Sequence, residues 1–447
     1  MMNSPFLIRS FASATASFFV LAGINAVSAA PESADTNIKV PTTSSAEQGQ
    51  TSLDEAFDLQ QWRSSTRLKA WEDTTFKFNF RTYYFDRNKF DGSESEAWAA
   101  GGWAGLKTGY FLDHIALGLT GYTSQHLQGS DDTDGTQLLA PGQEGYTVLG
   151  ELYTDILITE DMHLVIGRKE IDTPFINRDD SRMTPNTFEA ITLQGSVELG
   201  ANRGTIKYGA GYFDQIKNRN SDDFISMSRD AGATVDRGVF TAGGLWQKGD
   251  FSIGAIDYYS PDIINIAYLE AKLEVPVCND WKLNFATQYA DQRSVGDNLL
   301  TGSDFSSRQF GLKAELAAGH ALFTTAFTSV SGDADMQNPW SGYPGYTASQ
   351  VQDFDRQGED AFLVRAGYDF TAIEGLGTYV LGTFGSTPDQ AGQYRQDEYN
   401  VNLQWAPPSG VLKGLALRLR YGIVTESRSD SDTLTDFRVI CNYAFNF

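Results

Sequence analysis

The chain has 447 residues, a formal net charge of −23, 13% aromatic residues and a mean hydropathy of −0.32. Such acidity disfavours a nucleic-acid partner, because phosphates repel a negatively charged protein. Beyond the N-terminal leader the sequence has no stretch of about 18 uninterrupted apolar residues, which argues against a transmembrane helix.

The first thirty residues are typical of a secretory signal peptide. Arg9 is their only charged residue before position 30, and Phe18 to Ile24 form a short apolar core. Val27 and Ala29 then place small residues at the two positions that a signal peptidase reads. We therefore expect residues 1–29 to be removed on export by cleavage after Ala29.

Residues 30–68 are polar, rich in Ser, Thr and Gln, and without periodic pattern. Such a composition cannot bury enough apolar surface to fold on its own, so it predicts a mobile periplasmic extension. The sequence allows a short helix around Leu53 to Trp62. The folded domain is predicted to span residues 69–447.

From Thr75 onward, segments with alternating apolar and polar residues follow one another, as β-strands with two different faces require. Thr75 to Asp86 is the first of these. Clear successors are His114–Ser124, Thr147–Ile158, Ala190–Val197, Thr205–Phe213, Asn265–Val275, Trp281–Ala290, Arg308–Ala317, Ala321–Val330, Phe362–Phe370, Thr378–Gly385, Glu398–Trp405 and Leu415–Val424. Weaker segments are Glu96–Thr108, His163–Arg168, Val239–Trp246 and Phe251–Tyr259.

The last twelve residues, Asp436 to Phe447, alternate almost without fault and end on an aromatic residue. One apolar face, one polar face and a terminal Phe are typical of the closing strand of an outer-membrane β-barrel. An edge strand of a soluble β-sandwich has a similar pattern. With this segment the total is roughly 18 strands. The sequence therefore predicts an all-β fold, a transmembrane antiparallel up-and-down β-barrel.

The predicted connections alternate between long and short, as the two rims of a membrane barrel require. Short turns are Thr159–Asp161, Gln247–Asp250 and Ala318–His320. Long loops are Gln125–Gly145, Lys169–Thr187, Lys217–Arg237, Asp291–Phe305 and Ser331–Asp360. An even strand number places both termini at the short-turn rim, so we expect periplasmic termini and extracellular long loops. A barrel of this size is expected to leave an aqueous channel.

Charges at inward-facing positions are expected to line that channel, since a basic residue facing mid-membrane lipid costs about 2 to 4 kcal/mol. The inward basic residues are Lys77, Arg81, Lys272, Lys282, Lys313, Arg365, Arg418, Arg420 and Arg438. Several cluster near the predicted closure, whereas the acids Glu151, Asp155, Glu270 and Glu315 come mainly from other strands. The resulting transverse field would draw anions or carboxylates along one wall. Alternatively, each Arg pairs with a neighbouring acid for stability.

Neither a disulfide nor a catalytic motif is expected. Cys278 falls in a predicted turn and Cys441 in a strand facing lipid, so bridging distance is improbable. The four histidines, His114, His126, His163 and His320, lie near rims or turns, and no Gly-x-Ser-x-Gly, His-Glu-x-x-His or phosphate-loop pattern occurs. We therefore expect no cofactor and no metal.

Four stretches resemble the porin D (OprD-like) family of substrate-specific outer-membrane porins. The most specific is Ile171–Phe188, IDTPFINRDDSRMTPNTF, which is similar to the family's third-loop signature. The others are Arg81–Arg87, Asn338–Tyr346 continuing to Asp353–Glu359, and Gly410–Tyr421. The resemblance covers roughly Leu68 to Phe447, and the long polar segment before it departs from the family.

The resemblance implies an 18-stranded monomeric barrel whose third and seventh loops fold inward to form a constriction, with a ladder of basic residues leading solutes through. The implied constriction residues are Arg178, Asp179, Asp180, Ser181 and Arg182 in the third loop, and Trp340, Tyr343, Tyr346 and Asp353 in the seventh. With the inward residues of the first strand, the basic ladder is Lys77, Arg81, Arg365, Arg418, Arg420 and Arg438. Members of the family pass basic amino acids and small peptides, or aromatic and aliphatic carboxylates.

These observations predict a porin in the outer membrane of a Gram-negative bacterium that gives passive, selective diffusion of small carboxylates or amino acids. Expected partners are these solutes, outer-membrane lipid and lipopolysaccharide, and the barrel-insertion machinery, which Phe447 would address; nucleic acid is not expected. Two alternatives stay open from sequence: a barrel enzyme such as a hydrolase or protease, and a plugged structural or adhesion barrel.

Overall fold

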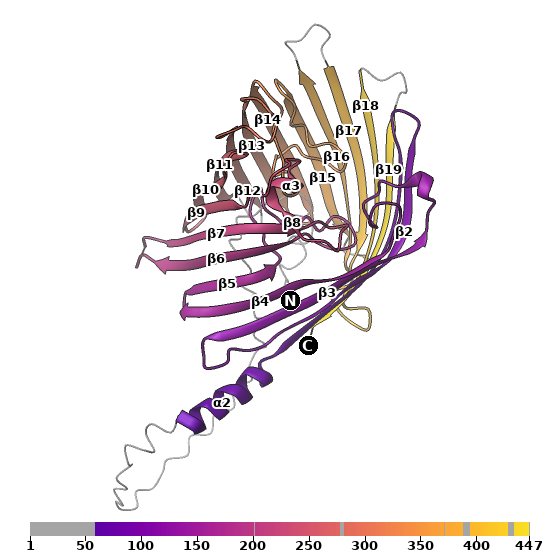
Figure 1. Cartoon of the computed structure of the whole chain (residues 1–447). Helices are drawn as coiled ribbons and strands as arrows, with labels where there is room; N and C mark the ends of the chain where they lie inside the picture. Colours follow the sequence, from indigo (N-terminus) through magenta and orange to yellow (C-terminus); the bar gives the residue numbers. More distant parts are fainter. Residues whose placement is uncertain are drawn as a thin grey trace, which may run out of the picture.

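Eighteen long strands form one antiparallel sheet that closes on itself (Figure 1). The computed structural model describes residues 59–200, 202–277, 281–370, 372–387, 394–427 and 433–446. The expected signal peptide, most of the polar extension, Cys278 and Phe447 lie outside these ranges. No helix of the described part is long and apolar enough to cross a membrane.

The strands follow one another around the wall in chain order. The first half comprises β1 (Thr75–Asn88), β2 (Glu94–Lys107), β3 (Ile115–Gln128), β4 (Tyr146–Thr159), β5 (Met162–Lys169), β6 (Thr187–Glu198), β7 (Thr205–Lys217), β9 (Val239–Lys248) and β10 (Phe251–Ser260). The second half comprises β11 (Ile264–Pro276), β12 (Lys282–Arg293), β13 (Ser306–Ala318), β14 (Ala321–Gly332), β15 (Asp360–Phe370), β16 (Leu376–Thr387), β17 (Tyr394–Trp405), β18 (Leu415–Glu426) and β19 (Leu434–Asn446).

Closure is made by β1, which pairs with β19 from Lys77↔Asn446 to Asn88↔Thr435. The two-residue strand β8 (Ile225–Ser226) pairs only with the end of β7, and β7 pairs directly with β9, so β8 belongs to a loop. All the expected strand segments, the four weaker ones included, fall on wall strands. The prediction of an 18-stranded antiparallel barrel is confirmed.

The alternation of side chains explains the wall. In β19, Asp436 and Arg438 are buried inside, whereas Phe437, Tyr443 and Phe445 are exposed outside. The same outward row of large apolar residues runs around the other strands, as an apolar environment requires. In this closing strand, the residues that the sequence predicts to face inward and outward therefore do so in the structure.

A helix, α2 (Leu59–Glu72), precedes β1 at the rim of short turns (Figure 1). It extends beyond Trp62, where the sequence pattern allows a helix to end, and across the expected boundary at residues 68 and 69. Contact with the β2–β3 turn stabilises this longer helix, because the Gly109 amide donates a hydrogen bond to the Ala70 carbonyl at 2.9 Å. The segment nearest the barrel is thus a docked helix, and the rest of the expected extension lies outside the described residues.

The opposite rim carries the long loops. Loop 2 (129–145) contains the 3-10 turn η3 (Asp131–Thr133), and loop 4 (218–238) contains β8 and the short helix α3 (Met227–Asp230). Loop 3 covers residues 170–186, loop 5 residues 261–263, loop 6 residues 294–305 and loop 7 residues 333–359. Both loops that the family resemblance singles out, loops 3 and 7, turn back into the barrel mouth.

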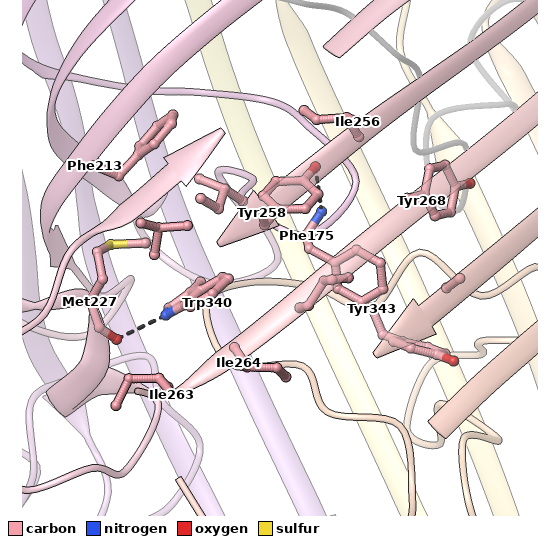
Figure 2. Packing of buried hydrophobic residues seen from close by; sticks show 14 of the residues in the cluster. Phe175, Phe213, Met227, Ile256, Tyr258, Ile263, Ile264, Tyr268, Trp340 and Tyr343 are labelled. Carbon is pink, nitrogen blue, oxygen red and sulfur yellow. Dashed lines mark hydrogen bonds between the residues drawn. The ribbon is translucent and has the colours of Figure 1, made fainter. Parts of the chain in front are cut away.

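An apolar cluster, formed by these loops and the inner faces of β6 to β14, fills one side of the mouth (Figure 2). The Phe175 ring of loop 3 packs edge-on against Tyr258, Tyr268 and Tyr343, with centroid distances of 6.0, 6.1 and 6.3 Å. Trp340 of loop 7 is 1% exposed and donates its indole N–H to the Met227 carbonyl at 2.8 Å. On this side the barrel mouth is therefore packed with apolar side chains of the loops and the wall.

Candidate pore constriction

Loops 3 and 7 are joined inside the barrel through Asn177. Its side-chain amide donates to the Gly342 carbonyl at 2.8 Å and accepts from the Gly342 amide at 3.2 Å. Its backbone N–H donates to the Ser341 hydroxyl at 2.6 Å, and that hydroxyl contacts the Asn177 carbonyl at 2.8 Å. The two loops therefore form one connected unit across the lumen, as the family resemblance implies.

Arg81 fastens loop 3 to the wall. It projects inward from β1 and forms a two-pronged ion pair with Asp180, at 2.6 and 3.1 Å, while its Nε donates to Asn442 on β19 at 2.6 Å. A further bond goes to the Arg182 carbonyl. Arg81 is only 7% exposed. Its guanidinium is thus occupied in holding loop 3, although the sequence places it in the solute-facing ladder.

Arg219 of loop 4 ties three loops together, and sequence reasoning missed it. Its guanidinium pairs with Asp179, donates to the Ser181 hydroxyl at 2.6 Å and contacts Gln137 of loop 2. Its backbone N–H donates to the Asn186 side chain at 2.7 Å. Arg219 is one of three arginines in loop 4, and the sequence alone does not identify a partner for any of them. Asp179 and Ser181 are therefore engaged in loop packing.

A buried basic cluster surrounds Phe85, whose ring is fully enclosed. The guanidinium carbons of Arg438, Arg182 and Arg87 lie 4.9, 5.1 and 5.2 Å from its centroid. Arg182 donates to the Thr136 carbonyl of loop 2 at 2.7 Å. These cation–π contacts and bonds offset the cost of burying Arg182 and Arg438, whereas Arg87 is 21% exposed and pairs with Asp436.

Arg438 anchors loop 7 to the barrel wall, as Arg81 anchors loop 3. It is 2% exposed, pairs with Asp436 at 2.6 Å and donates to the Gln350 carbonyl at 3.1 Å. Gln350 in turn donates its side chain to Asp436 at 2.6 Å. Two of the six ladder residues are therefore anchors of the constriction loops.

Arg418 and Arg420 differ from the rest of the ladder. Arg365 pairs with Glu315 at 3.1 Å, and Lys77 pairs with Glu151 at 2.7 Å. Arg418 donates to the Asn402 amide oxygen at 2.5 Å, and the Nε of Arg420 is buried with no hydrogen-bond partner among the described residues. Within the same ranges, neither Arg418 nor Arg420 has a carboxylate within 4.0 Å. Both residues are half-buried, and they lie on the inner face of β18.

Loop 3 presents further charges that are not enclosed. Arg178 is half-exposed and reaches Asp172 at 3.3 Å and Glu170 at 3.6 Å. Burial raises the pKa of the Asp172 carboxyl, and the nearby Arg178 charge opposes that rise. Arg178 thus lies between two acids of the same loop.

Loop 7 contributes acids and phenols. Burial, reinforced by Asp355, Asp179 and Glu398 and opposed by Arg219, raises the pKa of Asp353 to about 7. The Tyr346 hydroxyl donates to Glu270 at 2.7 Å, and the Lys313 amine lies 4.7 Å from the Tyr346 ring centroid. Trp340 and Tyr343, by contrast, lie inside the apolar cluster and determine the shape of loop 7 from within.

No group of three metal-ligating side chains occurs in the part of the chain that the structure describes. His163 lies 3.0 Å from Asp155, which also accepts from Tyr110 and Lys107, at 2.9 and 2.8 Å. The apolar grooves of about 440 and 720 Å³ are lined mainly by outward residues such as Phe285, Leu312 and Phe323. They belong to the outer face and not to the lumen.

Comparison with known proteins identifies the family to which this barrel belongs. The family model described as outer membrane porin, OprD family, matches residues 70–447. A search of curated protein sequences found no match. Among solved structures, Pseudomonas aeruginosa OpdK with vanillate is 23% identical, with a TM-score of 0.74 over 84% of this chain and 100% of that chain.

Two further structures show the same fold. Pseudomonas aeruginosa OccK9 (OpdG) is 24% identical, with a TM-score of 0.76 over 85% of this chain and 100% of that chain. A BenF-like porin from Pseudomonas fluorescens Pf-5 is 20% identical, with a TM-score of 0.74 over 85% of this chain and 100% of that chain. The expected resemblance is confirmed: the chain belongs to the OprD family of outer membrane porins.

Proposed function

We propose that the protein gives passive, substrate-selective diffusion of small carboxylate-bearing solutes, such as amino acids or aromatic and aliphatic acids. The observation that carries this proposal is the pair Arg418 and Arg420. The other four ladder residues each have a carboxylate partner, whereas these two have none in the described residues. Planar guanidiniums bind carboxylates with two parallel hydrogen bonds, so unpaired ones favour a carboxylate ligand.

The surroundings of the pair support a solute path along β15 to β19 and β1. The apolar cluster fills the side of β6 to β14, which leaves the charged side for water. Loop 3, which reaches into the lumen from another part of the wall, carries Asp172 and Glu170. Charges of opposite sign along one path would orient a solute that carries both an acid and an amine.

Selectivity would then come from aperture and electrostatics, with no cofactor and no energy input. The aperture depends on loops 3 and 7, which are held by Arg81–Asp180, by Asn177–Gly342 and by Arg438–Gln350. A rigid constriction with two unpaired guanidiniums can discriminate by charge, because a low-dielectric wall focuses their field.

The family's outer-membrane location supports a proposal for the orientation of the barrel. We propose that the long loops face the outside and contact lipopolysaccharide, and that both chain ends lie in the periplasm. Insertion by the barrel-assembly machinery would use the C-terminal strand, whose outer face carries Phe437, Tyr443 and Phe445. We further propose a monomer as the working unit.

The test is uptake by proteoliposomes combined with single-channel recording in planar bilayers. Vanillate, with which the OpdK structure was solved, is a small aromatic carboxylate and a suitable first probe. We expect ohmic steps and faster entry of vanillate than of its neutral methyl ester. Equal entry of acid and ester would contradict carboxylate selectivity, and absence of channel activity would contradict an open porin.

A further inference from the structure

We propose that α2 is a membrane-surface anchor whose Leu68 and Trp71 enter the phospholipid headgroup layer beside the short-turn rim. Both side chains are large and apolar, and they are 65% and 63% exposed. The neighbouring Arg67 and Lys69 are exposed as well. Trp beside basic residues is the composition that favours the interface between lipid and water.

The helix is held on the rim by its other face. Thr66 and Ala70, one helical turn apart, are buried, and the Ala70 carbonyl accepts from Gly109. A Cβ on Gly109 would lie 2.7 Å from the Asp73 Cβ, so the turn approaches α2 as closely as only glycine allows. At 100° per residue, Leu68 and Trp71 point away from this docked face.

The side of the rim on which α2 sits follows from the β2–β3 turn. Tyr110 points into the lumen, because its hydroxyl contacts Asp155 at 2.9 Å. The next residue, Phe111, therefore points outward, and Trp71 packs edge-on against it with a centroid distance of 5.6 Å. Phe111 forms a β-bridge with Ile115, whose side chain is exposed on the outer face of β3. The apolar surface of α2 is thus continuous with the lipid-facing band.

The distribution of tryptophan around this rim supports the same conclusion. Trp246, Trp281 and Trp405 occupy outward positions at or beside the short-turn ends of β9, β12 and β17. Such residues form the aromatic girdle that aligns a barrel with the headgroups. The short-turn ends of β1 to β7, all of them described strands, present no outward tryptophan. Trp71 supplies one there, from the helix instead of from the wall.

Site-directed spin labelling of the full chain tests the proposal in vesicles of phosphatidylethanolamine and phosphatidylglycerol. The background carries Cys278→Ser and Cys441→Ser. Labels are placed by Leu68→Cys, by Leu117→Cys on the lipid-facing surface of β3, and by Asp161→Cys at an exposed turn tip. Accessibility to oxygen reports lipid, and accessibility to a nickel chelate reports water.

We expect nickel accessibility at position 68 to be several-fold lower than at position 161, and oxygen accessibility to approach that at position 117. Equal nickel accessibility at positions 68 and 161 would overturn the proposal and favour a water-exposed or protein-binding helix. A second measurement does not depend on labels. Brominated phospholipid should quench Trp71 together with the outward tryptophans of the wall, so Trp71→Gln should lower the quenched fluorescence and leave the part that comes from the wall; an unchanged quenched amplitude in Trp71→Gln would also overturn the anchor.

Discussion

Arg420 and Arg438 are direct cross-strand partners on the inner faces of β18 and β19. Like charges in this relation repel, so each needs a counter-charge or a ligand. Arg438 has Asp436, whereas Arg420 has no carboxylate within reach among the described residues. The asymmetry makes Arg438 a structural anchor, and it supports our proposal that Arg420 attracts a passing anion.

Replacing Arg418 and Arg420 together with alanine is expected to lower vanillate entry into proteoliposomes by at least about tenfold. Hydrogen bonds to charged groups contribute about 1.5–3 kcal/mol each, and about 1.4 kcal/mol corresponds to a factor of ten. Bilayer reversal potentials should also show weaker anion preference.

Lys248→Ala with Lys413→Ala is the matched control, since it removes the same charge from exposed positions at the short-turn rim. Both double variants should show the heat-dependent gel shift of a folded barrel. Unchanged entry and unchanged selectivity in the Arg418/Arg420 variant would refute the guanidinium site.

The wall could be predicted from sequence because its rule is local. Every second residue of β19 faces lipid, and one-residue alternation shows this without knowledge of any partner strand. The same alternation predicts that the side chains of Arg81 and Arg438 face the inside of the barrel. What each arginine contacts could not be predicted, since Asp180 is 99 positions from Arg81 and Gln350 is 88 from Arg438.

The loop cluster was missed for a related reason, although a signal exists. Ile264, Ile266 and Tyr268 occupy inward positions of β11, while the outward Leu269 is also apolar. The part of β11 before Glu270 is thus apolar on its inner face, which indicates that side chains pack against it near the mouth, whereas the inward Glu270 and Lys272 follow further along the strand. The docking of Phe175 and Trp340 depends on loop conformation, which no periodic pattern determines.

Asp180→Asn is expected to loosen loop 3 while leaving the barrel closed. The Arg81 side chain is enclosed whereas that of Asp180 is 27% exposed, so removing the Asp180 charge leaves a buried cation without its counter-charge, at a cost below the roughly 3–5 kcal/mol of a fully buried pair. Single-channel records should therefore show larger current noise and a wider conductance distribution. Asp236→Asn, which removes one partner of the exposed Arg229–Asp236 pair, should leave both unchanged; equal noise in the two variants would contradict the anchor.

Anion preference should rise on acidification from pH 8 to pH 5, with a midpoint near 7. Burial first, then Asp355, Asp179 and Glu398, raise the pKa of Asp353 from 3.8 to about 7. Asp353 is therefore neutral below this value and negative above it. Because folding raises the pKa of Asp353, the protonated carboxyl stabilises the folded loop at acid pH. This stabilisation is lost as the pH rises through 7.

Reversal potentials across a salt gradient measure this shift, and Asp353→Asn should abolish it and keep the acid-pH selectivity throughout. Asp304→Asn, in the exposed loop 6, serves as the control. A wild-type midpoint near 4, or an identical pH profile in Asp353→Asn, would show that Asp353 does not titrate in the pore.

Deletion of Phe447 is expected to lower the amount of protein in the outer membrane, because the C-terminal aromatic residue is proposed to address the chain to the insertion machinery. Phe445 already packs against Phe78 at 5.2 Å, so the penultimate part of β19 should still close the barrel once inserted. Membrane fractionation measures the amount of protein in the outer membrane. The Phe447→Tyr variant, which keeps a C-terminal aromatic residue, should reach the wild-type level. Normal surface levels after deletion would contradict this role.

Asn177→Asp is expected to separate loops 3 and 7 at nearly constant side-chain volume. The carboxylate can still accept from the Gly342 amide, but it cannot donate to the Gly342 carbonyl, and it adds a negative charge close to Asp179 in the chain. Loss of a hydrogen bond to this partly buried carbonyl costs about 1 kcal/mol. Conductance should rise and vanillate selectivity should fall, whereas Asn298→Asp in loop 6 should change neither. Unaltered conductance in Asn177→Asp would mean that the aperture does not depend on the contact between the two loops.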